Sequence, residues 1–237
     1  MTLQSPTLLS MGVPVKGKTE AGLRREARAL QTRQRIVDAG LRLFLAQGYL
    51  STTVQDIAQA AGVAPATIYQ AFGSKAAVLA HGLDVSVVGD VDPVALLDRD
   101  WIRTARDEAD LVRRVQIVVG HAAGVAARTA ALKEVMRDAA ASAPEVRDLL
   151  REDTTRRQET QQALVGVLLQ GADLRDGLTQ DHAAATFFAL VNSHSFQLIV
   201  GHLGWSLERW TNWLIEVIYR DFFDQPHSAA PAGNPGR

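Results

Sequence analysis

The segment from Thr52 to Lys75 constrains the fold more than any other part of the chain, because it has the pattern of two short helices joined by a tight turn. Its sequence is TTVQDIAQAAGVAPATIYQAFGSK. Thr53, followed three residues later by Asp56, is close to a capping box, so a helix is predicted to begin directly after Thr53. Gly62 is the residue type that most easily adopts a left-handed backbone, which predicts a reversal of the chain at this position.

The small and apolar residues of this segment are spaced so that its two helices, 54–61 and 65–71, can pack together. The small side chain of Ala58 lets the helices approach closely, Gly62 makes the turn and Ile68 closes the core. This combination predicts a helix-turn-helix, the motif that places its second helix in the major groove of DNA. A helical hairpin with no relation to DNA is the alternative, although it has no reason to combine all three residues.

The second helix of such a motif presents its exposed residues to the edges of the bases. A glutamine such as Gln70 can pair with adenine through N6 and N7, and the methyl group of Thr67 can contact a thymine methyl. We expect the Tyr69 hydroxyl to donate to a phosphate, and residues that flank the motif to contact the sugar-phosphate backbone. The predicted DNA-contacting residues are Thr52, Thr53, Ala64, Pro65, Thr67, Tyr69, Gln70 and Lys75.

The stretch from Arg35 to Leu83 resembles the TetR family of bacterial regulators. The family pattern contains F-x-x-x-G-[YF], T-[TS]-[VM]-x-x-I-A, A-G-V and T-x-Y-x-x-F-x-[SN]-K. The matching residues are Phe44, Gly48, Tyr49, Thr52, Thr53, Val54, Ile57, Ala58, Ala61, Gly62, Val63, Thr67, Tyr69, Phe72, Ser74 and Lys75. The resemblance implies an all-helical protein whose C-terminal body holds a small-molecule effector and forms a dimer through its last two helices.

Four positions depart from that family pattern. Ala64 stands where Ser is common, which removes a helix cap worth ~1 kcal/mol. Pro65 replaces a frequent Lys or Arg, Ala66 replaces a common Gly, and Ala71 stands where a larger residue is usual. Few hydrogen-bonding side chains therefore remain for base recognition, so the sequence does not predict which operator is recognised.

The fold class that follows is all-α: an N-terminal three-helix helix-turn-helix DNA-binding domain plus a larger C-terminal helical ligand-binding and dimerisation domain. Apolar periodicity predicts a first helix over 30–47, and Pro93 is expected at a joint. The further predicted helices cover 107–127, 130–142, 144–170, 181–203 and 207–223. The expected domains are a flexible arm (1–28), a helix-turn-helix domain (29–83), an effector-binding and dimerisation domain (84–224) and a disordered tail (225–237).

Charge and composition narrow the classes of function. The net charge of −1 divides into +5 over residues 1–82 and −6 over residues 83–237. This division favours a polyanionic partner for the N-terminal segment 1–82 only. There is no cysteine and no run of 18 apolar residues, so we expect a cytoplasmic protein without disulfides or a membrane span. No phosphate-binding glycine loop, metal motif or nucleophile elbow is present, so we expect no enzyme, no metal and no cofactor.

Two sets of residues in the C-terminal body are candidates for binding. Polar or aromatic side chains within apolar helices could line an effector pocket: Trp101, His121, Met136, Phe188, Asn192 and His194. Apolar stripes on the last two helices could form the dimer interface: Phe187, Val191, Leu198, Leu207, Trp210, Leu214 and Val217. Each histidine could equally be an ordinary core or interface residue, and each stripe could be the chain's own core.

The function expected from these features is a ligand-responsive repressor. A homodimer would bind a palindromic double-stranded DNA operator, and a small-molecule effector in the body would weaken that complex. The last part of this expectation rests on the family resemblance alone. Two alternatives stay open: a weakly specific architectural DNA-binding protein without an effector, and a small-molecule-binding protein whose DNA role has lapsed.

Overall fold

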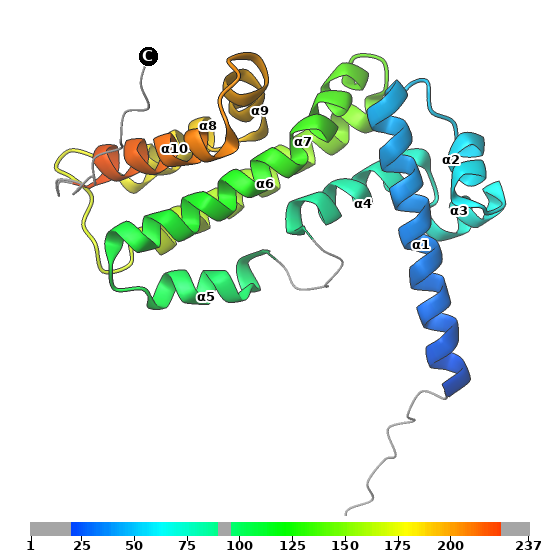
Figure 1. Cartoon of the computed structure of the whole chain (residues 1–237), viewed down its shortest axis with the longest axis horizontal. Helices are drawn as coiled ribbons and strands as arrows, with labels where there is room; N and C mark the ends of the chain where they lie inside the picture. The colour runs from blue at the N-terminus through cyan, green and yellow to red at the C-terminus, as the bar shows by residue number, and fades with distance from the viewer. Residues whose placement is uncertain (1–19, 90–95, 224–237) are drawn as a thin grey trace, which may run out of the picture.

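The computed structural model describes residues 20–89 and 96–223, and every regular element in these ranges is helical, so the predicted all-α class is confirmed (Figure 1). The elements are α1 (Glu20–Gln47), α2 (Val54–Ala61), α3 (Pro65–Phe72), α4 (Lys75–Val88), η1 (Leu96–Asp98), α5 (Asp100–Asp107), α6 (Leu111–Ala140), α7 (Pro144–Leu168), α8 (Gln180–Leu190), α9 (Ser193–Phe196), η2 (Gln197–His202) and α10 (Leu207–Phe222).

The N-terminal head is built on α1, which lies across the end of the helical body and carries α2 and α3 on its outer side (Figure 1). Its core is formed by Ile36, Phe44, Ile57, Ile68 and Leu79, which are fully buried or nearly so. Each of these residues comes from the apolar side of its helix, so the head satisfies the pattern that the sequence predicts.

The body is organised around α6 and α7, which run side by side, with α8 and α10 packed along them (Figure 1). Its core includes Phe187, Trp210 and Leu214, all wholly buried. Arg114 is also buried, and its guanidinium donates hydrogen bonds to the backbone carbonyls of Glu108, Leu168 and Gln170. A buried cation held by three carbonyls ties the start of α6 to the end of α7.

The head and the body share a second core, so they are not independent units. Met136 and Ala139 near the end of α6, and Val146 near the start of α7, are buried in the same cluster as the head residues. Helix α4 continues from this cluster into the body. Movement of α4 relative to α6 would therefore affect both parts of the protein.

Several helix boundaries differ from those that the sequence predicts. Helix α1 begins at Glu20, so the arm expected over 1–28 is helical from that residue on. The helices predicted over 107–127 and 130–142 are one continuous helix, α6, in which the Thr129 hydroxyl donates to Val125 O and does not interrupt the backbone. Helix α5 is an element that the sequence pattern does not reveal.

The helix predicted over 181–203 is broken after Leu190. The side chain of Asn192 accepts hydrogen bonds from the backbone N–H groups of His194 and Ser195, so it starts a new helix instead of continuing the old one. The following segment, η2, is a π-helical turn. The joint expected at Pro93, residues 1–19 of the arm and the tail expected over 225–237 lie outside the described residues.

Among the helices of the described chain taken singly, α6 is long and apolar enough to span a membrane by length and composition. In the structure 44% of that apolar stretch is buried inside the protein. Its Arg114 and Lys133 side chains face the interior of the body. A core helix passes the same test of length and hydropathy, and α6 packs against α4, α7, α9 and α10.

Candidate DNA-binding surface and effector pocket

Local hydrogen bonds define both ends of α2, as the sequence predicts. The Thr53 hydroxyl accepts a hydrogen bond from Asp56 N at 3.1 Å, and the Asp56 carboxylate accepts one from Thr53 N at 2.9 Å. The Thr53 hydroxyl also donates to the Asp56 carboxylate at 2.7 Å, and this bond together with that from Thr53 N holds the pKa of Asp56 below its usual value. At the other end, Gly62 has φ 65°, the left-handed conformation that reverses the chain towards α3.

The recognition helix α3 is fixed by groups outside itself more than by its own caps. Ala64 provides no side-chain cap at its start, as its residue type predicts. At its end, the Arg33 guanidinium donates to Ala71 O and lies 4.4 Å from the centroid of the Phe72 ring. Ile68 is the residue of α3 that is fully buried. Helix α1 thus holds α3 at its C-terminal end.

The outer face of α3 carries most of the residues that we expect to contact bases. Ala64, Pro65 and Gln70 are exposed, Tyr69 is 52% exposed, and Thr67 is half-buried. These side chains are free to reach a DNA groove, and the contacts themselves stay predictions. Thr53 is also exposed, with its hydroxyl in the capping box.

The structure corrects the role expected for Thr52. This side chain is 0% exposed, and its hydroxyl donates to Gly48 O at 2.8 Å. It therefore closes the turn between α1 and α2 and cannot offer its hydroxyl to a phosphate.

Lys75 also has internal partners that the sequence does not reveal. Its ammonium donates to Tyr49 O at 2.8 Å and to Thr52 O at 2.7 Å, and it lies 3.9 Å from the centroid of the Tyr49 ring. The Tyr49 hydroxyl in turn donates to Glu145 at the start of α7, at 3.0 Å. Burial, which outweighs the attraction of Glu145, lowers the pKa of Lys75. This chain of contacts links α4, the α1–α2 turn and the body.

A cavity of about 390 Å³ lies in the body between α4, α6, α7 and the segment after α8. A volume of this size suits a small organic molecule. Most of the surface of its wall is apolar, and the apolar residues that line it are Val87, Val88, Ala122, Val125, Ala126, Leu164 and Val191. The polar residues that line it are Asp84, Thr129, Lys133, Asp153, Arg156, Arg157, Thr160, Gln161, Asn192 and Ser193.

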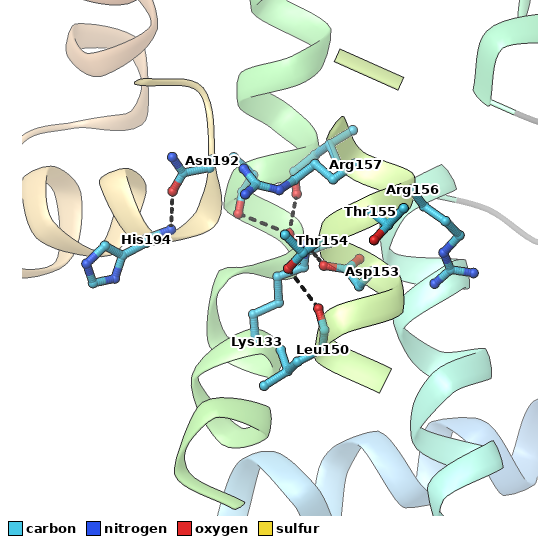
Figure 2. A network of polar contacts seen from close by, with 12 residues as sticks. Lys133, Leu150, Asp153, Thr154, Thr155, Arg156, Arg157, Asn192 and His194 are labelled. Carbon is cyan, nitrogen blue, oxygen red and sulfur yellow. Dashed lines mark hydrogen bonds and ion pairs between the residues drawn. The ribbon is translucent and has the colours of Figure 1, made fainter. Parts of the chain in front are cut away.

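The charged groups of the cavity come from three helices. Lys133 of α6 and Asp153 of α7 form a buried ion pair of 2.7 Å, and they lie side by side in Figure 2. Burial lowers the pKa of Lys133, although Asp153 opposes this. Arg156 forms an ion pair with Asp84 of α4 at 3.3 Å, nearer to solvent.

Two further side chains of α7 carry polar groups into the same region. The Arg157 guanidinium lies 3.8 Å from the centroid of the Phe188 ring and donates to Phe188 O at 3.4 Å. In Figure 2, Arg157 extends from α7 towards Asn192. Gln161 is 6% exposed, and its Nε2 donates to Val191 O at 2.6 Å while its Oε1 has no hydrogen-bond partner among the described residues.

Of the residues expected to bind an effector, the structure brings Asn192 to this cavity. Phe188 lies beneath Arg157 and so supports the cavity indirectly. Trp101 and His121 stack on each other, with ring centroids 4.4 Å apart, beside a separate hollow of about 300 Å³. Burial lowers the pKa of His121.

The two remaining candidates do not reach the cavity. Met136 is wholly buried in the core shared by head and body, and His194 is exposed on α9. The sequence reasoning missed Lys133, Asp153 and Gln161, because charged and amide side chains on long helices usually face solvent. A signal was present, since all three stand at positions where the apolar stripe of their helix continues.

The structure also corrects the expected dimer interface. Phe187, Val191, Trp210 and Leu214 have at most 1% of their surface exposed within one chain, so they form the chain's own core and cannot meet a partner. The remaining three residues of that set are accessible: Leu198 is 48% exposed, Leu207 is 43% exposed and Val217 is half-buried.

Residues 36–81 match the model of a family described as bacterial regulatory proteins, tetR family. The HTH-type transcriptional regulator TtgW of Pseudomonas putida is 37% identical to this chain over 82 residues. That alignment covers 32% of this chain and 58% of TtgW, and the match to the regulator SrpR of the same species covers 37% of SrpR. The chain thus spans a little over half the length of the first of these curated relatives.

Solved structures of low sequence identity share the fold over most of the chain. A transcriptional regulator from Saccharomonospora viridis in complex with choline superposes with a TM-score of 0.61 at 22% identity, covering 83% of this chain and 100% of that one. The regulator FadR from Bacillus subtilis in complex with stearoyl-CoA gives a TM-score of 0.60 at 20% identity, covering 78% and 96%. All of these proteins are described as transcriptional regulators. The match therefore identifies residues 36–81 with the TetR family of bacterial regulatory proteins, and the solved structures show that the chain shares their all-helical fold.

Proposed function

We propose that this protein is a DNA-binding transcriptional regulator whose DNA affinity is set by a small molecule in the body. The observation that carries the proposal is the position of α4. It supplies Val78, Leu79 and Leu83 to the core of the head, and its C-terminal end supplies Val87 and Val88 to the wall of the cavity. One rigid helix therefore connects the DNA-binding head to the cavity.

Support for DNA binding comes from the head. The helix-turn-helix is closed by the Thr53–Asp56 capping box and the left-handed Gly62, and its second helix leaves Tyr69 and Gln70 accessible. The excess of basic residues in the first 82 positions favours a polyanion. We propose that α3 binds in the major groove of DNA.

Support for a ligand response comes from the contacts that hold the end of α4. Arg128 of α6 donates to Ser86 O and Val87 O, both at 3.1 Å, and Asp84 of α4 pairs with Arg156 of α7. These polar contacts are exposed and can be rearranged at low cost. A ligand that filled the cavity would press on Val87 and Val88, shift α4 and so turn the recognition helix.

We further propose that two copies bind a palindromic operator. Two recognition helices related by a two-fold axis read half-sites one helical turn apart, about 34–36 Å centre to centre. The exposed Leu198, Leu203 and Leu207, which lie close together in the sequence around the start of α10, provide apolar surface for such an association. We also propose that the bound dimer represses transcription and that an effector in the body releases it from the operator.

The experiment is a binding titration with fluorescently labelled duplexes. Fragments from the region upstream of the gene and its neighbours are compared with random-sequence duplexes of equal length, at several salt concentrations. We expect a specificity ratio of at least about 10³ for one palindromic fragment. A ratio near one for all fragments would refute specific regulation and favour the architectural alternative. Sedimentation of the protein on the best fragment then counts the copies bound.

A further inference from the structure

The charges that face the body cavity do not cancel. Its lining contains three cationic side chains, Lys133, Arg156 and Arg157, and two carboxylates, Asp84 and Asp153. Lys133 is paired with Asp153 at 2.7 Å and Arg156 with Asp84 at 3.3 Å. The cavity therefore carries one net positive charge from the described residues that line it.

Among the described residues, Arg157 is the cation of this set that has no carboxylate ion pair of its own. Its guanidinium donates to one backbone carbonyl, Phe188 O, and packs against the Phe188 ring. Asp153 lies close enough to stabilise its charge, but the Lys133 ammonium already pairs with that carboxylate. A guanidinium has five N–H donors in a planar fork that fits a carboxylate. Most of these donors are left for a ligand.

Gln161 provides a second, independent sign of a polar ligand. Its side chain is buried, and its Oε1 has no partner among the described residues. The orientation of the amide is fixed, because its Nε2 donates to Val191 O at 2.6 Å and a flip would place two oxygens against each other. A buried acceptor without a donor is unfavourable, so a ligand that supplies an O–H or N–H gains affinity there.

Both groups lie on the same face of α7. Arg157 and Gln161 are four residues apart, which places their Cβ atoms roughly 5–6 Å from each other. Most of the remaining wall surface is apolar and includes Val87 and Val88 of α4 and Val125 of α6. A ligand that satisfies both side chains therefore has an apolar body with an acceptor and a donor at separate points.

We propose that the cavity selects a small, largely apolar carboxylate that also carries a hydroxyl or N–H donor. The carboxylate accepts hydrogen bonds from the Arg157 guanidinium, and the donor gives its hydrogen to Gln161 Oε1. An organic cation is disfavoured, because it would enter a cavity that already has an excess positive charge. The inference rests on the proposed function and deepens it by naming the chemical class of the effector.

The test uses matched sets of an acid, an amide and an amine on the same skeleton. One set is 3-(4-hydroxyphenyl)propionate, its primary amide and tyramine, and 3-phenylpropionate lacks the hydroxyl. A second set is built on a C8 aliphatic chain. Binding to the full-length protein is measured by calorimetry and thermal shift. We expect the acid to bind about 10- to 100-fold more tightly than the amide, the ratio typical of a charged hydrogen bond, and the amine to bind most weakly.

Substitutions assign the selectivity to named groups. Arg157→Met keeps the apolar stem over Phe188, and we expect it to remove the acid-over-amide ratio while leaving amide affinity unchanged. Gln161→Met is expected to remove the preference for the hydroxylated acid over 3-phenylpropionate. The matched control is Arg151→Met, since Arg151 is exposed on the same helix, pairs with Asp148 and does not line the cavity.

The outcomes separate this inference from the proposed function. An amide or amine that binds as tightly as its acid, or the failure of every acid at millimolar concentration, would overturn the anion proposal even if operator binding is specific. Acid selectivity that depends on Arg157 would support it even if no operator is found. If Arg157→Met does not fold, the order of acid, amide and amine on the wild-type protein decides alone.

Discussion

The substitution Lys75→Met tests whether this lysine acts inside the protein or on DNA. Its ammonium makes hydrogen bonds of 2.8 Å and 2.7 Å to the carbonyls of Tyr49 and Thr52, and it packs on the Tyr49 ring. Hydrogen bonds to a charged group contribute about 1.5–3 kcal/mol each, and the half-buried position of Lys75 reduces this by solvent screening. We therefore expect the head to lose about 2–4 kcal/mol of stability, because Thr52 O is left without its donor.

The assay must report on the head, because Trp101, Trp205, Trp210 and Trp213 all lie in the body. Hydrogen exchange of the backbone amides of α2 and α3 gives the local opening free energy of the helix-turn-helix, and circular dichroism follows global unfolding in urea. We expect exchange of these amides to accelerate by a factor of about 30 or more, which corresponds to the lower end of the predicted loss. Residues around α10 should exchange at the wild-type rate.

The same variant distinguishes the two roles by the salt dependence of DNA binding. Loss of one phosphate contact lowers the slope of log K against log salt by about 0.9. An internal lysine leaves this slope unchanged once the head is folded. Arg35→Met is the control, since Arg35 is exposed on α1. Normal exchange rates in Lys75→Met, together with a slope reduced by about 0.9, would refute the structural role and restore that of a phosphate anchor.

Three further changes have definite expected outcomes. Gln70→Ala should relax the preference at one base pair of each half-site, by about 1–3 kcal/mol of discrimination, in binding to a randomised operator library; an unchanged profile would show that Gln70 does not face the bases. Burial, with help from Glu145, raises the pKa of Tyr49 above its ordinary 10.0, so the folded state keeps a proton that the unfolded chain releases. The stability that this proton contributes is present below pH 10 and is lost as the pH rises further. In urea titrations above pH 10, the free energy of unfolding should therefore fall less steeply with pH for Tyr49→Phe than for the wild type. Equal slopes of the two proteins would contradict this. Lys133→Met should lower the free energy of unfolding in urea by about 3–5 kcal/mol, because it leaves Asp153 buried without its partner. The double variant Lys133→Met with Asp153→Leu should recover most of this loss. A double variant as unstable as the single one would show that the pair itself is essential.

The sequence predicts the helix-turn-helix closely because the interactions that define it are local. Thr53 and Asp56 cap each other across three residues, and Gly62 supplies a backbone conformation that follows from its residue type. The ends of α2 and α3 agree with the predicted helices to within one residue. The exposed face of α3 follows as well, once Ile68 is placed in the core.

The sequence is much less informative about the body, where the same residue types serve different purposes. The stripe that contains Phe187, Trp210 and Leu214 has the spacing of a helical interface, but periodicity does not say whether the opposite surface belongs to the same chain. Helix ends were equally uncertain there, since α6 continues through a position that was expected to be a break.

By itself, the sequence determined the all-helical class, the helix-turn-helix and the accessible Tyr69 and Gln70, because these follow from spacings of a few residues. Only the tertiary structure decided that Lys75 holds the α1–α2 turn and that Arg157 and Gln161 face a cavity. The physical reason is that the partners of these polar groups come from distant segments of the chain. Whether a charged side chain faces water or an interior depends on which helix packs against it.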